Sequence, residues 1–187
     1  MAAVAAAVLA FLLALFTTRV SGVSMSPTLR DGDALLVDKV SVQYRTPERG
    51  DVVLVVEPGG VGLVKRVIAV PGDAVEIDGS GPRPVVLLEP GGRGPWRRLE
   101  EPYVTSWTGR EFCCDEKGLE LGLSAPQPLL LPPNRYFLLG DNRDGSTDSR
   151  RFGLFSRDQV VARVAFRWWP VASAGPVDGR AALAPVD

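Results

Sequence analysis

Short apolar runs alternate with polar, turn-rich stretches along most of the chain. Each run is rich in β-branched residues and is bounded by glycine, proline or aspartate, which is the pattern of short β-strands. No stretch between the runs has helical periodicity of useful length. The pattern predicts a mostly β fold, an antiparallel sheet or barrel, and argues against alternating β–α units. The runs are Ala34–Val42, Asp51–Val56, Leu63–Val70, Ala74–Ile77, Pro84–Leu88, Pro128–Pro132, Tyr136–Gly140 and Val160–Trp169.

An apolar segment at the N-terminus has a different character. Residues 2–18 carry no charged side chain, and Arg19 ends the segment. This length is just sufficient for a transmembrane helix, which needs roughly 17–25 residues. A cleaved signal peptide is the alternative, but the basic region expected before its apolar stretch is absent. We predict one N-terminal membrane anchor over residues 1–18, whose orientation no flanking lysine or arginine indicates.

The rest of the chain suits one domain with appendages, because 187 residues are enough to bury one core. We predict a β-rich domain over residues 19–169, with a variable insertion at 105–127. Residues 170–187 have little apolar surface to bury, so we expect a flexible tail. The insertion holds the only cysteines, Cys113 and Cys114. Two loop thiols are favoured over a vicinal disulfide, because neighbouring cysteines rarely reach good disulfide geometry.

Composition narrows the chemistry that this domain can perform. The chain has no histidine and a formal net charge of -1. The absence of histidine excludes Ser-His-Asp triads, Cys-His nucleophiles and the usual histidine zinc sites. Without a clustered basic face, nothing favours nucleic acid as a partner. Acid–base chemistry near neutral pH must therefore come from a carboxylate or from a lysine with a shifted pKa.

A polar segment, GDNRDGSTDSRRFG at residues 140–153, has the composition of a turn or of a built site. A calcium loop aligned on Gly145 would place Gly140 and Arg151 at positions that need acidic ligands, so that match fails. The glycine-rich stretch before Lys65 lacks the Gly-Lys-Ser/Thr order of a phosphate loop. We therefore predict neither a metal site nor a cofactor.

The chain has three lysines that could act as a base. Lys117 lies beside Asp115 and Glu116, which would keep it protonated. Lys39 follows Asp38 within a predicted strand and suits an ordinary lysine whose amine reaches solvent. Lys65 shares one strand face with apolar residues, so an inward orientation would lower its pKa, whereas an outward one would leave it solvated.

A neutral lysine can take a proton from a serine, as in Ser-Lys nucleophile pairs. Physical reasoning from the residues leaves three candidate serines, Ser21, Ser24 and Ser26, which follow the apolar segment.

Three segments, read in order after the apolar segment, carry a specific resemblance. They are VSMSPTL at residues 23–29, VKRVIAVPGD at 64–73 and GDNRDGSTDSRRFG at 140–153. Together they resemble the type I signal peptidases, which are membrane-bound serine proteases with a Ser-Lys dyad. The similarity runs from the anchor to about Trp169 and omits the Cys-Cys loop and the tail.

The resemblance implies a role for individual residues. It selects Ser24 as the nucleophile and Lys65 as the general base, and it implies that Ser146 orients the lysine amine. Asp148 and Arg150 match the pair expected to brace the site. Asp141 and Asn142 belong to the same signature. Met25 is either a wall of the substrate pocket or a core residue. At the position of Gly22, some family members have a serine that donates a hydrogen bond to the oxyanion.

The same resemblance implies acyl transfer on precursor proteins that carry signal peptides, with small residues one and three positions before the cut. It implies a single-pass protein of the plasma membrane with its catalytic domain on the outer side. Membrane lipid is the other expected partner, and Trp168 and Trp169 could lie at the lipid interface or pack within the fold. A self-cleaving repressor would need a DNA-binding segment before the serine. A β-rich binding module without activity is the expectation if Lys65 faces water.

Overall fold

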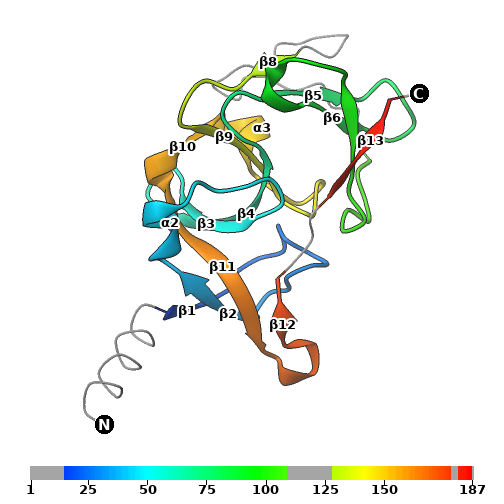
Figure 1. Cartoon of the computed structure of the whole chain (residues 1–187). Helices are drawn as coiled ribbons and strands as arrows, with labels where there is room; N and C mark the ends of the chain where they lie inside the picture. Colours follow the sequence, from blue (N-terminus) through cyan, green and yellow to red (C-terminus); the bar gives the residue numbers. More distant parts are fainter. Residues whose placement is uncertain (1–14, 109–127, 178–180, 187) are drawn as a thin grey trace.

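A computed structural model of the chain describes residues 15–108, 128–177 and 181–186. Within them the fold is built from two antiparallel sheets, and its helices are single turns (Figure 1). The two short α-helices are α2 (Ser41–Tyr44) and α3 (Ser149–Phe152). The prediction of a mostly β, antiparallel fold is confirmed.

The larger sheet carries Lys65 and the strand that leads into the polar segment 140–153. Its strand order is β1-β2-β11-β3-β4-β9-β10, with β12 added beside β11. Strand β4 pairs with β3 over Gly62–Arg66, and with β9 only from Arg66 onward. The bounds are β1 Leu15–Arg19, β2 Ala34–Asp38, β3 Val52–Val56, β4 Gly62–Ala69, β9 Arg135–Leu139, β10 Phe155–Ser156, β11 Val160–Trp169 and β12 Gly175–Pro176.

The smaller sheet lies at the other end of the molecule, near the C-terminus in Figure 1. Its strand order is β13-β7-β6-β5-β8. One apolar cluster joins the two sheets, because it combines Ile77 and Leu88 of the smaller sheet with Ile68 and Phe137 of the larger one. The bounds are β5 Ala74–Asp78, β6 Val85–Glu89, β7 Arg97–Glu100, β8 Leu129–Leu130 and β13 Ala182–Pro185.

All eight predicted runs contain a strand, with differences at their ends. The first run stops at Asp38 instead of Val42, because the Asp38 carboxylate accepts hydrogen bonds from the backbone N–H groups of Val40 and Ser41 and turns the chain into α2. Strand β7 escaped prediction because its sequence, RRLE, is mostly charged. Only Leu99 of that strand is buried, so apolar alternation was too weak a signal.

The predicted membrane anchor lies almost entirely outside the described residues. Its last residues, 15–18, belong to strand β1, which pairs antiparallel with β2. Strand pairing supplies backbone hydrogen bonds there, so a helix over residues 1–18 does not extend to these four. Over the described ranges we find no helix long and apolar enough to cross a membrane.

The C-terminal tail corrects another expectation. Residues 170–187 were expected to be flexible, yet β12 pairs with β11, and β13 pairs with the edge strand β7. Leu183 lies opposite Leu99 in the second pairing and packs on the cluster that joins the sheets. Its few apolar residues are therefore enough to hold this part of the tail, since the edge strand supplies the hydrogen bonds.

We predict that Leu183→Asp lowers the free energy of unfolding by about 1–2 kcal/mol, because it places a charge where an apolar side chain is half-buried. Ala182→Asp is the matched control, since Ala182 is the exposed neighbour on the same strand. Urea denaturation of the full chain measures both. Equal, negligible effects of the two substitutions would mean that this segment does not pack in solution.

Candidate active site

Ser24 and Lys65 meet although 41 positions separate them in the sequence. Ser24 lies in the loop between β1 and β2, and Lys65 lies in β4. The distance from Lys65 Nζ to Ser24 Oγ is 2.8 Å. When the lysine is protonated its ammonium donates this hydrogen bond; when it is neutral its nitrogen can accept the hydroxyl proton.

Burial makes the neutral form of Lys65 accessible. The residue is only 1% exposed, so the alternative of a lysine that faces water is excluded. Loss of hydration lowers the pKa of Lys65 to about 8, although the Asp148 carboxylate acts to raise it and Arg150 acts to lower it further. Along the described chain, Lys65 forms no ion pair with a carboxylate at salt-bridge distance. The ammonium form therefore still predominates at pH 7, but the neutral amine is present as a minor fraction that grows as the pH rises toward 8.

The polar segment 140–153 holds the serine loop by its backbone. The Asn142 N–H donates to the Ser24 carbonyl at 3.0 Å, and Asn142 Nδ2 donates to the Val23 carbonyl at 3.2 Å. Contacts to main-chain atoms position Ser24 without occupying its hydroxyl group. The segment is therefore a second wall of the site and more than a solvated turn.

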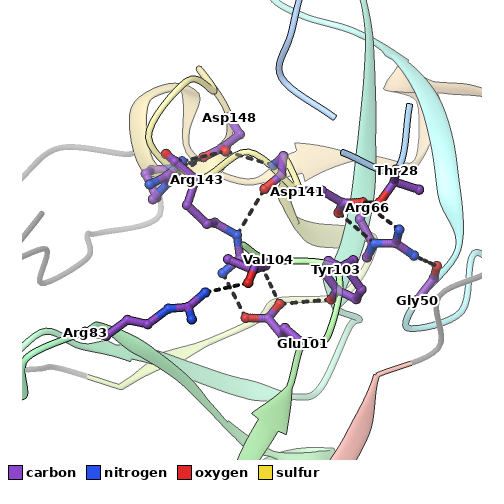
Figure 2. A network of polar contacts seen from close by, with 12 residues as sticks. Thr28, Gly50, Arg66, Arg83, Glu101, Tyr103, Val104, Asp141, Arg143 and Asp148 are labelled. Carbon is purple, nitrogen blue, oxygen red and sulfur yellow. Dashed lines mark hydrogen bonds and ion pairs between the residues drawn. The ribbon is translucent and has the colours of Figure 1, made fainter. Parts of the chain in front are cut away.

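Next to Lys65, Arg66 points to the other side of β4 and is fully buried. It donates two hydrogen bonds to Asp141, from Nε to Oδ1 at 2.8 Å and from Nη2 to Oδ2 at 2.7 Å. The Thr28 hydroxyl donates to the same carboxylate at 2.5 Å (Figure 2). One buried ion pair thus ties β4, the serine loop and the polar segment together.

Asp148 begins the short helix α3 and is completely buried. Arg150 donates to it from Nε and from Nη2, each at 2.9 Å, and the Gly140 N–H donates at 2.9 Å. Burial alone would raise the pKa of Asp148, but these hydrogen bonds and the Arg150 charge lower it overall. Arg150 also donates to the Arg143 carbonyl at 2.8 Å, so the pair braces the loop internally.

The Ser146 side chain packs directly against Gly140. A Cβ at Gly140 would overlap the Ser146 side chain and would lie 2.5 Å from the Ser24 carbonyl oxygen. Ser146 Oγ is buried and finds no hydrogen-bond partner among the described residues. Its hydroxyl contributes to the low pKa of Asp148 without reaching hydrogen-bond geometry. It is thus an unsatisfied polar atom beside the reactive serine, where a structural role would leave it paired.

The remaining two expectations concern the start of the serine loop. The Met25 side chain is 1% exposed and packs in an apolar cluster with Val20 and Leu29, which favours its role as a core residue. Gly22 has φ +96°, and its N–H donates to Asp31 at 2.8 Å. A side chain at Gly22 would be strained in this conformation, because only glycine adopts it readily.

Three residues that contact the buried arginines Arg66 and Arg143 escaped sequence reasoning. They are Glu101, Tyr103 and Trp107, which follow β7 in the chain, and Trp107 lies within the predicted insertion 105–127. Arg143 pairs with Glu101 and lies over the Trp107 ring, and Arg66 lies over Tyr103. No motif marks these residues. The excess of arginine over lysine is the one sequence signal that could have suggested acidic and aromatic partners.

Comparison with known proteins identifies the family of the chain. A family model described as "Signal peptidase, peptidase S26" matches residues 1–169. The chain is 36% identical over 155 residues to signal peptidase IB of Staphylococcus aureus (strain COL), covering 81% of this chain and 76% of that protein. It is 29% identical over 159 residues to a probable signal peptidase I-2 of Synechocystis sp., covering 81% of this chain and 62% of that protein.

A crystal structure of a signal peptidase I from Enterococcus faecalis V583 is 27% identical, with a TM-score of 0.45, and the match covers 64% of this chain and 97% of that one. The family match spans the serine loop, Lys65 and the polar segment alike. The chain therefore belongs to the signal peptidase family, peptidase S26, and is a serine endopeptidase that removes signal peptides from precursor proteins.

Proposed function

We propose that Ser24 is the nucleophile of this peptidase and that Lys65 is its general base. One observation carries the assignment: a lysine nitrogen with a lowered pKa lies 2.8 Å from a serine hydroxyl in a site without histidine. Ser21 and Ser26 have no such contact with a base in the described part of the chain. The choice among the three serines thus has a geometric reason beside the family resemblance.

In the first step, neutral Lys65 takes the Ser24 hydroxyl proton while the oxygen attacks the scissile carbonyl carbon. The carbonyl π electrons move to oxygen and form a tetrahedral oxyanion. The protonated lysine then gives its proton to the departing amine nitrogen as the C–N bond breaks, which leaves an acyl-enzyme. Neutral Lys65 then takes a proton from a water molecule as its oxygen attacks the ester carbon. The second tetrahedral oxyanion collapses, the bond from carbon to Ser24 Oγ breaks, and Ser24 Oγ recovers its proton from Lys65 while the acid product leaves.

The oxyanion needs hydrogen-bond donors aimed at its position. The Ser24 N–H is a candidate, because it makes no hydrogen bond within the described ranges. Gly22 offers no side-chain hydroxyl, so the main chain must supply more of the stabilisation here. A pre-aimed donor is worth roughly 3–4 kcal/mol, which makes the conformation of this loop important.

An extended substrate has a free strand edge on which to bind. Strand β9 pairs with β4 only from Arg66 onward, so the side of Gly62–Lys65 that faces away from β3 has no strand partner among the described residues. A peptide added to this edge would place a backbone carbonyl near Ser24, in the mode of β-strand addition. Small side chains one and three positions before the cut are what the family resemblance implies for this substrate.

Ser146, Asp148 and Arg150 would support this chemistry without bonding to substrate. We assign to Ser146 the task of orienting the lysine amine during the reaction, since its buried hydroxyl makes no hydrogen bond in the described structure, to Lys65 or to any other residue, and is available for this task. Asp148 and Arg150 hold the loop on which Ser146 lies. Met25 as a wall of the substrate pocket stays a prediction, and the packing of its side chain in the core does not favour it.

A membrane location completes the proposal. A membrane anchor ahead of strand β1 would hold the domain on the outer side of the plasma membrane, where exported precursors emerge. Trp168 and Trp169, at the end of β11, are 41% and 48% exposed, which suits contact with the lipid interface. A repressor-type self-cleaving protease and an inactive binding module are the alternatives, and loss of activity in the variants below would exclude the latter.

We predict that Ser24→Ala and Lys65→Ala each reduce cleavage of a precursor with an Ala-x-Ala site by at least about 10³-fold, because each removes one half of the dyad. The assay uses the full chain in membranes and follows release of the mature product. Ser21→Ala and Lys39→Ala are the matched controls and keep normal rates. Near-normal cleavage by either dyad variant would refute the assignment.

The pH dependence follows from the lowered pKa of Lys65, about 8. Only the neutral amine can accept the proton, so kcat/KM rises about tenfold per pH unit below this value and levels off above it. Initial rates measured between about pH 6 and about pH 9 test this. A flat profile over that range would contradict a lysine base.

Ser146→Ala tests the orienting hydroxyl. We expect kcat to fall about ten- to hundredfold with the protein still folded, because a misplaced base transfers the proton less efficiently. Ser80→Ala, at an exposed serine, serves as the control. If Ser146→Ala cleaves at the normal rate, the hydroxyl has no part in the reaction.

A further inference from the structure

Residues 101–107, which follow strand β7, contact the polar segment from outside all three motifs of the dyad site. Figure 2 shows Glu101 and Tyr103 beneath Arg143 and Arg66. Both arginines are fully buried. A buried guanidinium needs a paired anion and satisfied hydrogen bonds, so whatever supplies them also determines where the arginine lies.

Glu101 supplies the anion for Arg143. Its carboxylate accepts from Nη1 at 2.9 Å and from Nη2 in a shorter contact, so the pair is bidentate. The Glu101 side chain is 8% exposed and that of Arg143 is not exposed at all. A bidentate pair fixes the plane of the guanidinium as well as its position.

In this orientation the remaining guanidinium nitrogen of Arg143, Nε, faces the start of the polar segment. Arg143 Nε donates to the Gly140 carbonyl at 3.0 Å. Gly140 is the residue whose Cα approaches both the Ser24 carbonyl and the Ser146 side chain too closely for a Cβ. Any shift of Gly140 is therefore transmitted to the nucleophile loop and to the Ser146 hydroxyl.

Tyr103 connects the same carboxylate to the other buried arginine. Its hydroxyl donates to Glu101 at 2.9 Å, and Arg66 Cζ lies 4.0 Å from the centre of its ring. Burial and the nearby Glu101 carboxylate raise the pKa of Tyr103, so the phenol keeps its proton and remains a donor. Arg66 in turn is adjacent to Lys65 in the chain and holds Asp141.

We propose that Glu101 is a positioning residue of this peptidase, which acts through Arg143 and Gly140 on Ser24 and Ser146. It touches neither the reacting atoms nor the substrate edge of β4. Its effect is to hold the distance and orientation between the two walls of the site, one on the serine loop and the other on the polar segment. The inference rests on the proposed roles of Ser24 and Lys65.

The test is Glu101→Gln in the full chain, which keeps the side-chain shape and removes the charge. We expect kcat to fall about ten- to hundredfold while KM stays within about twofold, because misplacement of the reacting groups affects the reaction step and not the strand edge that binds substrate. Assays are run well below the unfolding temperature of each variant, with the folded fraction measured by circular dichroism. Glu100→Gln is the control, since Glu100 is the exposed neighbour in β7, and it keeps normal kcat and KM.

A purely structural role predicts a different result: Glu101→Gln would unfold at a lower temperature, yet its folded fraction would cleave with normal kcat, and this would overturn the proposal. If Glu101→Gln does not fold, Arg143→Lys decides. It retains the positive charge but cannot hold both Glu101 and the Gly140 carbonyl, so we expect the same loss of kcat. Normal kcat in folded Arg143→Lys would overturn the proposal, and activity in Ser24→Ala would instead overturn the dyad.

Discussion

The site depends on a buried amine, that of Lys65, which has no carboxylate at hydrogen-bond distance among the described residues. Several charged side chains are almost completely buried here, and Arg66, Arg143 and Asp148 are each neutralised by a partner. Lys65 is buried as deeply and has a serine hydroxyl as its hydrogen-bond partner instead. The ammonium form therefore loses hydration without full compensation, and its pKa falls to about 8. A carboxylate at hydrogen-bond distance would raise the pKa of Lys65 again and keep the amine protonated, so that it could not act as a base.

This requirement explains why the neighbouring charges are so completely paired. Asp141 and Asp148 both act to raise the pKa of Lys65. Arg150, which is paired with Asp148, lowers that pKa, and Arg66 holds the Asp141 carboxylate by two hydrogen bonds. The same pairs also anchor the chain, since each links segments that are distant in sequence or closes a tight loop. Electrostatic balance and loop geometry are thus provided by the same side chains.

Prediction from sequence succeeded where the signal is local. Strands β3, β4, β5 and β11 were predicted within about two residues, because apolar β-branched runs bounded by glycine and proline depend little on distant contacts. Strands β7 and β13 escaped, because a charged segment becomes a strand by pairing with β6 and a tail segment becomes one by pairing with β7. Ser24, Lys65 and Ser146 were identified by resemblance, whereas composition and spacing alone left three serines and an unresolved orientation of Lys65.

Glu101 shows why the rest of the site could not be predicted. Nothing distinguishes it from its exposed neighbour Glu100 in the sequence, and only the folded chain places it against a buried arginine. The sequence by itself determined the β architecture, the absence of histidine chemistry and the residue types available for a Ser-Lys site. The tertiary structure alone decided which lysine is dehydrated, which serine lies beside it and which charges brace them. Those properties depend on burial and on contacts between residues such as Ser24 and Asn142, which lie far apart in the sequence.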